Sequence, residues 1–216
     1  MTELLNLYRE RASDPAFWAE PVNAITNGSF LIAAICGLWL AHSRDTLTPV
    51  TMVLIGLAMT IGVGSFLFHT AVSPFTMWLD VVPIAAFQVA FLWLLCHEML
   101  GFRTTSAALI VLMVLTSTFM LMPTHHILNG SLFYAPTLFA VFVLGGLWAK
   151  QSPQEPYLLI VAGGCFAVAL AARTLDWHVP WPVGSHFLWH LLNGVVVYCA
   201  IRAWVVHLLV ERTLRT

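Results

Sequence analysis

Two histidines, His186 and His190, lie four residues apart at the start of a strongly apolar stretch. In a helix this spacing puts both imidazoles on one face, one turn apart. A third histidine, His69, ends another apolar stretch and follows Ser65 by four residues. Three neutral histidines without a cysteine form a zinc ligand set that leaves a fourth position for water. Zinc lowers the pKa of such a water to about 7, so this set predicts a hydrolytic site.

Asp80 is the residue best suited to proton transfer beside such a site. It lies about one turn into an apolar stretch, where a carboxylate costs about 2.5–3.5 kcal/mol. The short connection after His69 brings Asp80 to a similar depth, and only Arg173 offers a cation there for a structural salt bridge. A carboxylate can take a proton from water and return it to a leaving amine. A hydroxyl such as that of Ser65 can donate to a developing oxyanion. We therefore predict catalytic roles for Asp80 and Ser65.

The composition identifies the elements that must position these residues. The chain has 216 residues, of which 60% are hydrophobic and 9% charged, whereas a soluble domain has about 25% charged residues. We therefore predict an integral membrane protein that has the lipid bilayer as its partner. A net charge of −1 gives no basic surface for nucleic acid, and no obligate protein partner is evident.

Seven stretches have about the 20 apolar residues that a spanning helix needs. They are roughly 22–42, 48–70, 76–99, 104–122, 131–150, 156–174 and 184–209. Because the connections are short, we expect a single all-α domain over 1–216, with sequential helices antiparallel and a short N-terminal segment, 1–20.

The basic residues predict how this seven-transmembrane-helix bundle is oriented. Six Lys and Arg residues fall on the side of the C-terminus and three on the other side. By the positive-inside rule the C-terminus is then cytoplasmic and the N-terminus is outside. The candidate residues converge on the outer leaflet under this topology: Glu20, Ser65, His69, Asp80, His186 and His190.

Simpler interpretations exist for each motif taken alone. A single serine or histidine in a membrane helix can merely bond a neighbouring group. Glu20, Asn23 and Asn27 follow helical spacing, and on this motif alone we favour a carboxylate near a helix N-terminus and asparagines that bond neighbouring helices. The convergence of all these residues on one leaflet favours a shared site instead.

The other histidines and the cysteines are weaker candidates. Three histidines fall toward the cytoplasmic ends, and three more fall in outer loops as interface residues: His42, His97 and His207, then His125, His126 and His178. Of these, His178 is the first alternative ligand. Four cysteines lie within apolar runs, where we expect buried free thiols: Cys36, Cys96, Cys165 and Cys199.

Together these motifs resemble the alkaline ceramidases, in the superfamily of seven-helix zinc hydrolases that includes the progestin/adiponectin receptors. Three ordered motifs cover nearly the whole chain: Glu20-x-x-Asn23-x-x-Thr26-Asn27; Ser65-x-x-x-His69 with Asp80; and Asp176 with His186-x-x-Trp189-His190-x-x-x-Gly194-x-x-x-Tyr198. The resemblance implies that His69, His186 and His190 hold zinc, with Asp80 and Ser65 around the attacking water. The implied reaction is hydrolysis of a ceramide to a sphingoid base and a fatty acid.

The chain departs from this family just before its first long apolar stretch. Eukaryotic members carry an acidic calcium-binding stretch there, whereas this chain reads ASDPAFWAEPVN. Asp14, Glu20 and Asn23 offer oxygen ligands, and with Asp176 they are candidates for a calcium site or for support of the zinc ligands. The fuller acidic cluster is not evident, and no cysteine falls in an outer loop to form the lumenal disulfide of such members. The compact loops favour a bacterial inner membrane, or an endomembrane if the protein is eukaryotic.

Three functions fit these observations. The leading hypothesis is an intramembrane zinc hydrolase that admits a ceramide-like lipid sideways between its helices. The second is a receptor-like protein with a structural zinc, which would release little or no fatty acid. The third is a small transporter that uses Asp80 and the histidines as a proton relay. A transporter would need polar residues along the full depth of the bundle, whereas here they collect in one leaflet.

Overall fold

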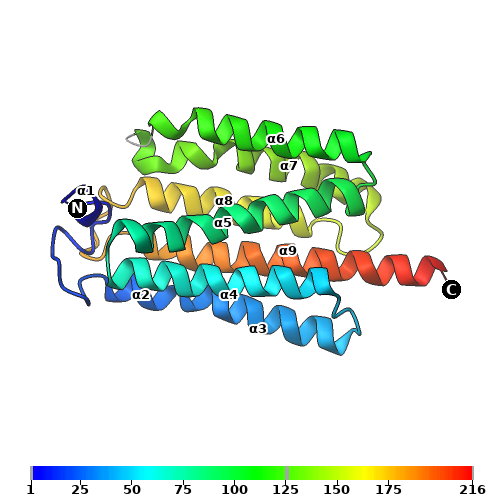
Figure 1. Ribbon diagram of the computed structural model, residues 1–216, viewed down its shortest axis with the longest axis horizontal. Coiled ribbons are helices and arrows are strands. Elements are labelled where there is room, and N and C mark those ends of the chain that lie inside the picture. The colour runs from blue at the N-terminus through cyan, green and yellow to red at the C-terminus, as the bar shows by residue number, and fades with distance from the viewer. Residues whose placement is uncertain (1, 125–126, 216) are drawn as a thin grey trace.

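All elements of this computed structural model, which describes residues 2–124 and 127–215, are helical (Figure 1). The long helices are α3 (Gly28–Ser43), α4 (Pro49–Thr70), α5 (Pro74–Leu94), α6 (Thr104–Met120), α7 (Ala135–Gln151), α8 (Leu158–Thr174) and α9 (His186–Arg215). Short elements are α1 (Thr2–Leu5), α2 (Pro21–Thr26), a π-helical turn η1 (Leu95–Met99) and the 3-10 segments η2 (Met122–Thr124) and η3 (Ile127–Tyr134). The predicted all-α class is confirmed.

Five helical stretches within the described residues are long and apolar enough to cross a membrane. They are Pro21–Ser43, Pro49–Thr70, Pro74–Met99, Ile127–Gln151 and His186–Leu214. Two further apolar helices, α6 and α8, have 17 residues each and are shorter. Each of the seven predicted stretches therefore coincides with a helix, while five of them meet the criterion for a span.

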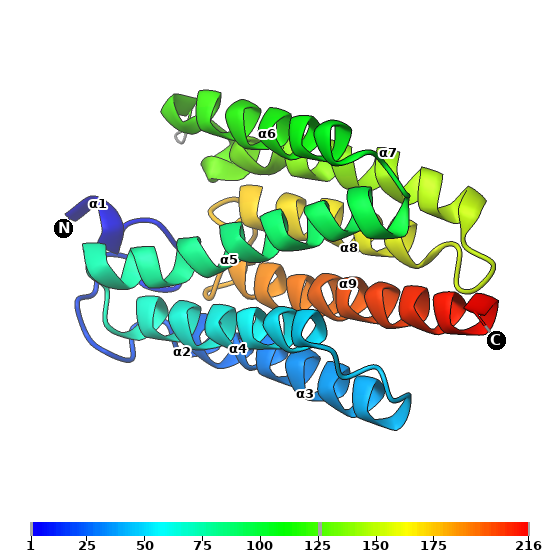
Figure 2. The same ribbon diagram turned by 45° about the vertical axis from the view of Figure 1, so that its right-hand side comes forward.

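The bundle runs along one long axis, with the N-terminal segment covering the end opposite the C-terminus (Figure 1). Helix α9 packs against α3, α4 and α8, and α4 packs along α5. Helices α6 and α7 lie side by side in an outer layer in both views (Figure 2). The end covered by the N-terminal segment holds the last turn of α4 and the first turns of α2, α5 and α9.

Capping residues and prolines determine where α4 and α5 begin, at opposite ends of the bundle. Thr48 and Ser73 accept hydrogen bonds from the backbone N–H three residues later, and Pro49 and Pro74 take the first helical positions. The connection between α4 and α5 therefore consists only of residues 71–73, which keeps the end of α4 beside the start of α5.

Two predictions need correction. The α-helical part of the stretch predicted at 131–150 begins only at Ala135, because the residues from 131 to 134 still belong to the 3-10 segment η3. All four cysteines are predicted to be buried, whereas Cys165 is half-buried and Cys36, in α3, is exposed. Large apolar side chains are exposed along the same helix, including Ile32 and Trp39, so this face is suited to lipid, and an apolar run does not imply burial within the protein.

Helices α4 and α5 approach each other closely at Gly64. A Cβ atom there would lie 1.9 Å from the carbonyl oxygen of Leu79, so only glycine lets the two backbones meet. Ser65 and Asp80 are the next residues on the two helices. Gly64 therefore sets the separation between these two candidate catalytic residues.

Replacement of Gly64 by alanine is expected to push α4 and α5 apart, since the obstructing atoms belong to the backbone. Overpacking of this kind costs about 1–3 kcal/mol, so Tm measured in detergent should fall, and activity should fall with it. Gly56→Ala in the same helix is the control, because a Cβ there meets nothing within 4 Å. Equal Tm values for the two variants would show that this close approach is not required.

Candidate metal centre

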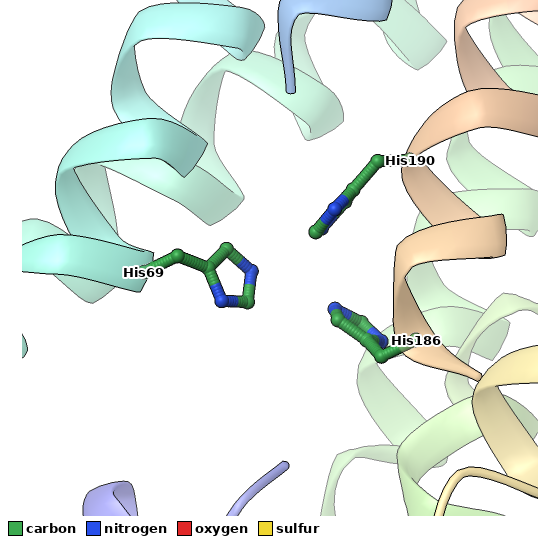
Figure 3. Close-up of side chains that lie close together, drawn as sticks. All are labelled: His69, His186 and His190. Carbon is green, nitrogen blue, oxygen red and sulfur yellow. The ribbon is translucent and has the colours of Figure 1, made fainter. Parts of the chain in front are cut away.

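Three histidines from two helices meet at the covered end of the bundle. His69 lies in the last turn of α4, while His186 and His190 lie one turn apart at the start of α9. Their ligand nitrogens all lie within 4.8 Å of one another, and each side chain is buried. Figure 3 shows the three rings directed toward a common space. The structure thus brings together the three residues predicted as ligands.

The chemistry of this histidine triad fits a metal ion. His69 Nε2 and His186 Nδ1 are buried and have no hydrogen-bond partner within the protein. A buried polar atom without a partner costs about 1–3 kcal/mol, and a metal ion would satisfy these nitrogens. The triad can therefore hold a metal.

Glu20 orients the imidazole of His69. Its Oε2 lies 2.6 Å from His69 Nδ1 and accepts from Asn23 Nδ2 at 3.0 Å. A metal-binding histidine usually gives its second ring nitrogen to such an acceptor. Glu20 precedes α2 but makes no side-chain capping bond to it, so its position near a helix N-terminus does not explain its role.

The N-terminal segment secures this pair through Arg11, which is 2% exposed. Arg11 Nε donates to Glu20 Oε1 at 2.6 Å, and Nη2 donates to the carbonyl of His69 at 2.8 Å. Nη1 donates to the carbonyls of Asp14 and Ala16 at 2.9 and 3.1 Å. Arg11 thus holds His69 both through its backbone and, by way of Glu20, through its ring.

These bonds also determine the charge of Glu20. Burial raises the pKa of its carboxyl, but the bonds from His69, Arg11 and Asn23 outweigh burial and hold the pKa below its ordinary value. The group is therefore a carboxylate at neutral pH, and it accepts the Nδ1 proton of His69.

Replacement of Arg11 by methionine should weaken metal binding. The change leaves the buried Glu20 carboxylate without its cation, and loss of a supporting interaction of this kind lowers metal affinity by about 10- to 100-fold. Competition with a chelator measures this affinity, and Arg44→Met, at an exposed position, is the control. Unchanged affinity in the Arg11 variant would show that the N-terminal segment does not support the ligands.

Thr26 orients the second ligand, His190. The Thr26 hydroxyl donates to the carbonyl of Val22 at 2.7 Å, so it accepts from His190 Nδ1 at 3.0 Å. This bond leaves Nε2 of His190 as the nitrogen with a free lone pair. Ser29 Oγ donates to the His190 carbonyl at 2.7 Å and fixes the first turns of α9 against α3.

Asp176 positions the third ligand by capping α9. Its Oδ1 accepts from the backbone N–H groups of Ser185 and His186 at 2.7 and 2.8 Å, and Oδ2 accepts from the N–H of Arg9 at 2.9 Å. Gly184 has a φ of +67°, and a Cβ there would lie 2.2 Å from Asp176 Oδ1. The loop therefore closes tightly on the carboxylate, which fixes His186 at the first position of the helix.

The contacts of the four candidate calcium ligands do not form a cluster of free oxygen atoms. These candidates are Asp14, Glu20, Asn23 and Asp176. Both carboxylate oxygens of Glu20 and both of Asp176 accept the hydrogen bonds described above, and Asp14 is exposed and bonds the N–H of Ala16. Asn23 Oδ1 alone is buried without a partner. Of the two functions considered for these residues, the contacts favour support of the histidines over calcium binding.

Asp80 and Ser65 lie beside the triad. The two side chains interact, and Asp80 is also within electrostatic range of His69 and of Arg173. Its Oδ1 is buried and has no hydrogen-bond partner. The structure therefore leaves one oxygen of this carboxylate free to face a ligand or a water molecule.

Sequence reasoning missed two residues that complete the site, Tyr8 and Arg11. The Tyr8 ring stacks on His186 with centroids 3.8 Å apart, and burial raises the pKa of its hydroxyl. In the sequence, Arg11 is one of the three basic residues on the outer side, where the positive-inside rule disfavours them. That discrepancy is the one sequence signal that points to it. The alternative ligand His178 is exposed and does not join the triad, and His125 and His126 lie outside the described residues.

Comparison with known proteins identifies the family. A search of curated proteins finds no match. A family model described as "Ceramidase" matches residues 15–215, which include every residue of the triad and both candidate catalytic residues. Because this match extends over nearly all of the sequence, the chain belongs to the ceramidase family.

Proposed function

We propose that this protein is an intramembrane zinc-dependent amide hydrolase that cleaves ceramide-like lipids to a sphingoid base and a free fatty acid. Family membership implies a hydrolase that acts on amide bonds and suggests ceramide as the substrate. The observation that carries the proposal is the buried histidine triad, with unpaired nitrogens, beside an Asp80 oxygen that also lacks a partner.

Zinc is the metal that best fits these donors. Three imidazoles are a common catalytic zinc set, and the absence of a thiolate or carboxylate from the triad leaves a coordination position open. When bound, zinc supplies a water of lowered pKa and a Lewis acid for the amide carbonyl.

The residues around the triad carry out proton transfer, stabilise the developing negative charge and orient the ligands. Asp80 accepts the proton of the attacking water and returns it to the departing nitrogen, which makes the amine a viable leaving group. The Ser65 hydroxyl donates to the oxygen on which negative charge develops. Glu20 and Thr26 hold the ring nitrogens of His69 and His190 in the tautomers that leave the other nitrogen free.

An apolar cavity beside the triad can take a segment of a lipid chain. It has a volume of about 140 Å³ and extends between α5, α6, α7, α8 and α9. Ile84, one turn after Asp80, and Trp189, next to His190, lie on its wall. The lining is almost entirely hydrocarbon, as an acyl chain requires.

The full topology belongs to the same proposal. Helices α6 and α8 span about 26 Å at 1.5 Å per residue, close to the bilayer core of about 30 Å. We infer that both cross the membrane, which gives seven spans with the N-terminus outside and the C-terminus cytoplasmic. A bacterial inner membrane is the favoured location.

The direct test is fatty-acid release by the purified protein from ceramides of different chain lengths. Release should be seen with the protein and be absent after treatment with a chelator. His178→Ala is the matched control, since this exposed histidine lies outside the triad. Zinc binding without release from any lipid amide would favour the receptor-like alternative.

A further inference from the structure

Arg173 is a cation at the site that forms no ion pair among the described residues. It lies in the last turn of α8. Its Nη1 donates to the Tyr8 hydroxyl at a long 3.3 Å, and its Nε is buried without any hydrogen-bond partner. The guanidinium therefore has hydrogen-bonding capacity that the protein does not use.

Aromatic rings stabilise this charge without using its N–H groups. The guanidinium carbon lies 5.8, 5.9 and 5.4 Å from the ring centroids of Tyr8, Tyr134 and Trp189. Cation–π contacts of this kind contribute about 0.5–2 kcal/mol each, whereas an unpaired donor away from water remains costly. Ionisable side chains at membrane depth usually serve a function, so the free N–H groups indicate a ligand.

The surroundings of Arg173 define the shape of that ligand. The guanidinium donates to the hydroxyl of Tyr8, whose ring stacks on the metal-site residue His186. Trp189, whose ring Arg173 contacts, also lines the apolar cavity. Arg173 therefore stands where the cavity meets the metal centre. A molecule that fills both has an apolar chain and an anionic head.

We propose that Arg173 binds the carboxylate of an amphiphilic lipid within the site. The planar guanidinium fork suits a carboxylate, which it can bind with two parallel hydrogen bonds. The proposal rests on the proposed function, because amide hydrolysis itself produces this group. Water adds its oxygen to the acyl carbon, the C–N bond breaks, the nitrogen gains a proton, and the released acid ionises to a carboxylate.

The carboxylate has two possible sources that share this chemistry. It is either the fatty acid that leaves the site or the head group of an N-acyl amino acid substrate. In both cases the apolar chain occupies the cavity and the anion lies against Arg173.

Equilibrium binding of dodecanoic acid and dodecanol tests the proposal, since the two ligands differ in the charge of the head. The wild-type protein should bind the acid more tightly. Arg173→Met should lose about 10- to 100-fold in affinity for the acid and keep its affinity for the alcohol. Arg173→Lys should retain part of the preference because it keeps the charge. Lys150→Met, an exposed cation distant from the site, is the control.

Metal content is measured on every variant, because a bound metal would also attract a carboxylate. Equal losses for acid and alcohol in Arg173→Met would assign Arg173 a structural role and overturn the proposal. A wild-type protein without preference for the acid would overturn it without any variant. If Arg173→Met does not fold, the Arg173→Lys variant is used instead. Equal affinity of that variant for the acid and the alcohol would overturn the proposal.

Turnover distinguishes the two sources. If the anion is the product, Arg173→Met should weaken inhibition by dodecanoic acid during ceramide hydrolysis by a larger factor than it changes KM for ceramide. If it is a substrate head group, the wild type should hydrolyse N-dodecanoylglycine, and the variant should raise KM for that substrate alone. Charge-dependent acid binding without hydrolysis of either lipid would contradict the proposed function and leave the Arg173 site standing.

Discussion

His190→Ala is expected to abolish both metal binding and amide hydrolysis. The substitution removes one of three ligands that converge within 4.8 Å, and two imidazoles on separate helices hold zinc weakly. Without the metal the water keeps its ordinary pKa and the carbonyl is not polarised. Turnover should fall on the order of 10⁴-fold or more. Elemental analysis and fatty-acid release measured on the same preparation check both effects.

The matched control is His178→Ala, which removes an exposed histidine of the loop before α9. It should leave the zinc content and the rate unchanged. A His190→Ala protein that retains both zinc and activity would place the metal elsewhere in the chain.

Asp80→Asn is expected to separate catalysis from metal binding. Asparagine keeps the shape of the side chain and cannot accept the proton of the attacking water. Loss of a general base or acid lowers the rate by about 10²- to 10⁴-fold. Zinc content should remain that of the wild type, because Asp80 is not part of the triad. A kcat measurement beside elemental analysis tests both statements.

Asp14→Asn makes the same chemical change at an exposed carboxylate of the N-terminal segment. It should have little effect on kcat, which also tests the candidate calcium ligand. Near wild-type turnover by Asp80→Asn would show that another group transfers the proton.

The parts of the site that could be predicted from sequence depend on short-range spacing. His186 and His190 share a helical face because they are four residues apart. His69 and Asp80 lie near each other because three residues connect α4 and α5. Such relations depend on helix geometry and on capping residues, which sequence records directly.

Arg11 and Tyr8 could not be predicted as supporting residues, because their contacts are distant in sequence and lack a repeating pattern. Arg11 contacts His69 across 58 positions, and it does so through a backbone carbonyl that any residue could supply. Tyr8 reaches His186 from an irregular segment that has no periodicity to place it. The N-terminal segment closes over the site through such contacts, and only the folded chain reveals them.

The contacts of Arg173 could not be predicted from sequence for a different reason. Its charge and its depth were evident from the sequence, which offered Arg173 as the one cation at a depth suitable for a salt bridge with Asp80. In the structure the two charges lie near each other without an ion pair, and aromatic rings surround the guanidinium. The direction in which a long side chain extends depends on packing, which the sequence does not record.

The most direct test of a zinc hydrolase centred on the histidine triad is the dependence of activity on zinc occupancy. The purified protein would be stripped with a chelator and then reloaded with zinc in steps, with bound zinc and fatty-acid release from ceramide measured at each step. Release should rise in proportion to zinc and reach its maximum at about one zinc per chain, the number that one three-histidine site holds. Full release by the stripped protein, or one zinc per chain with no release at all, would contradict this function.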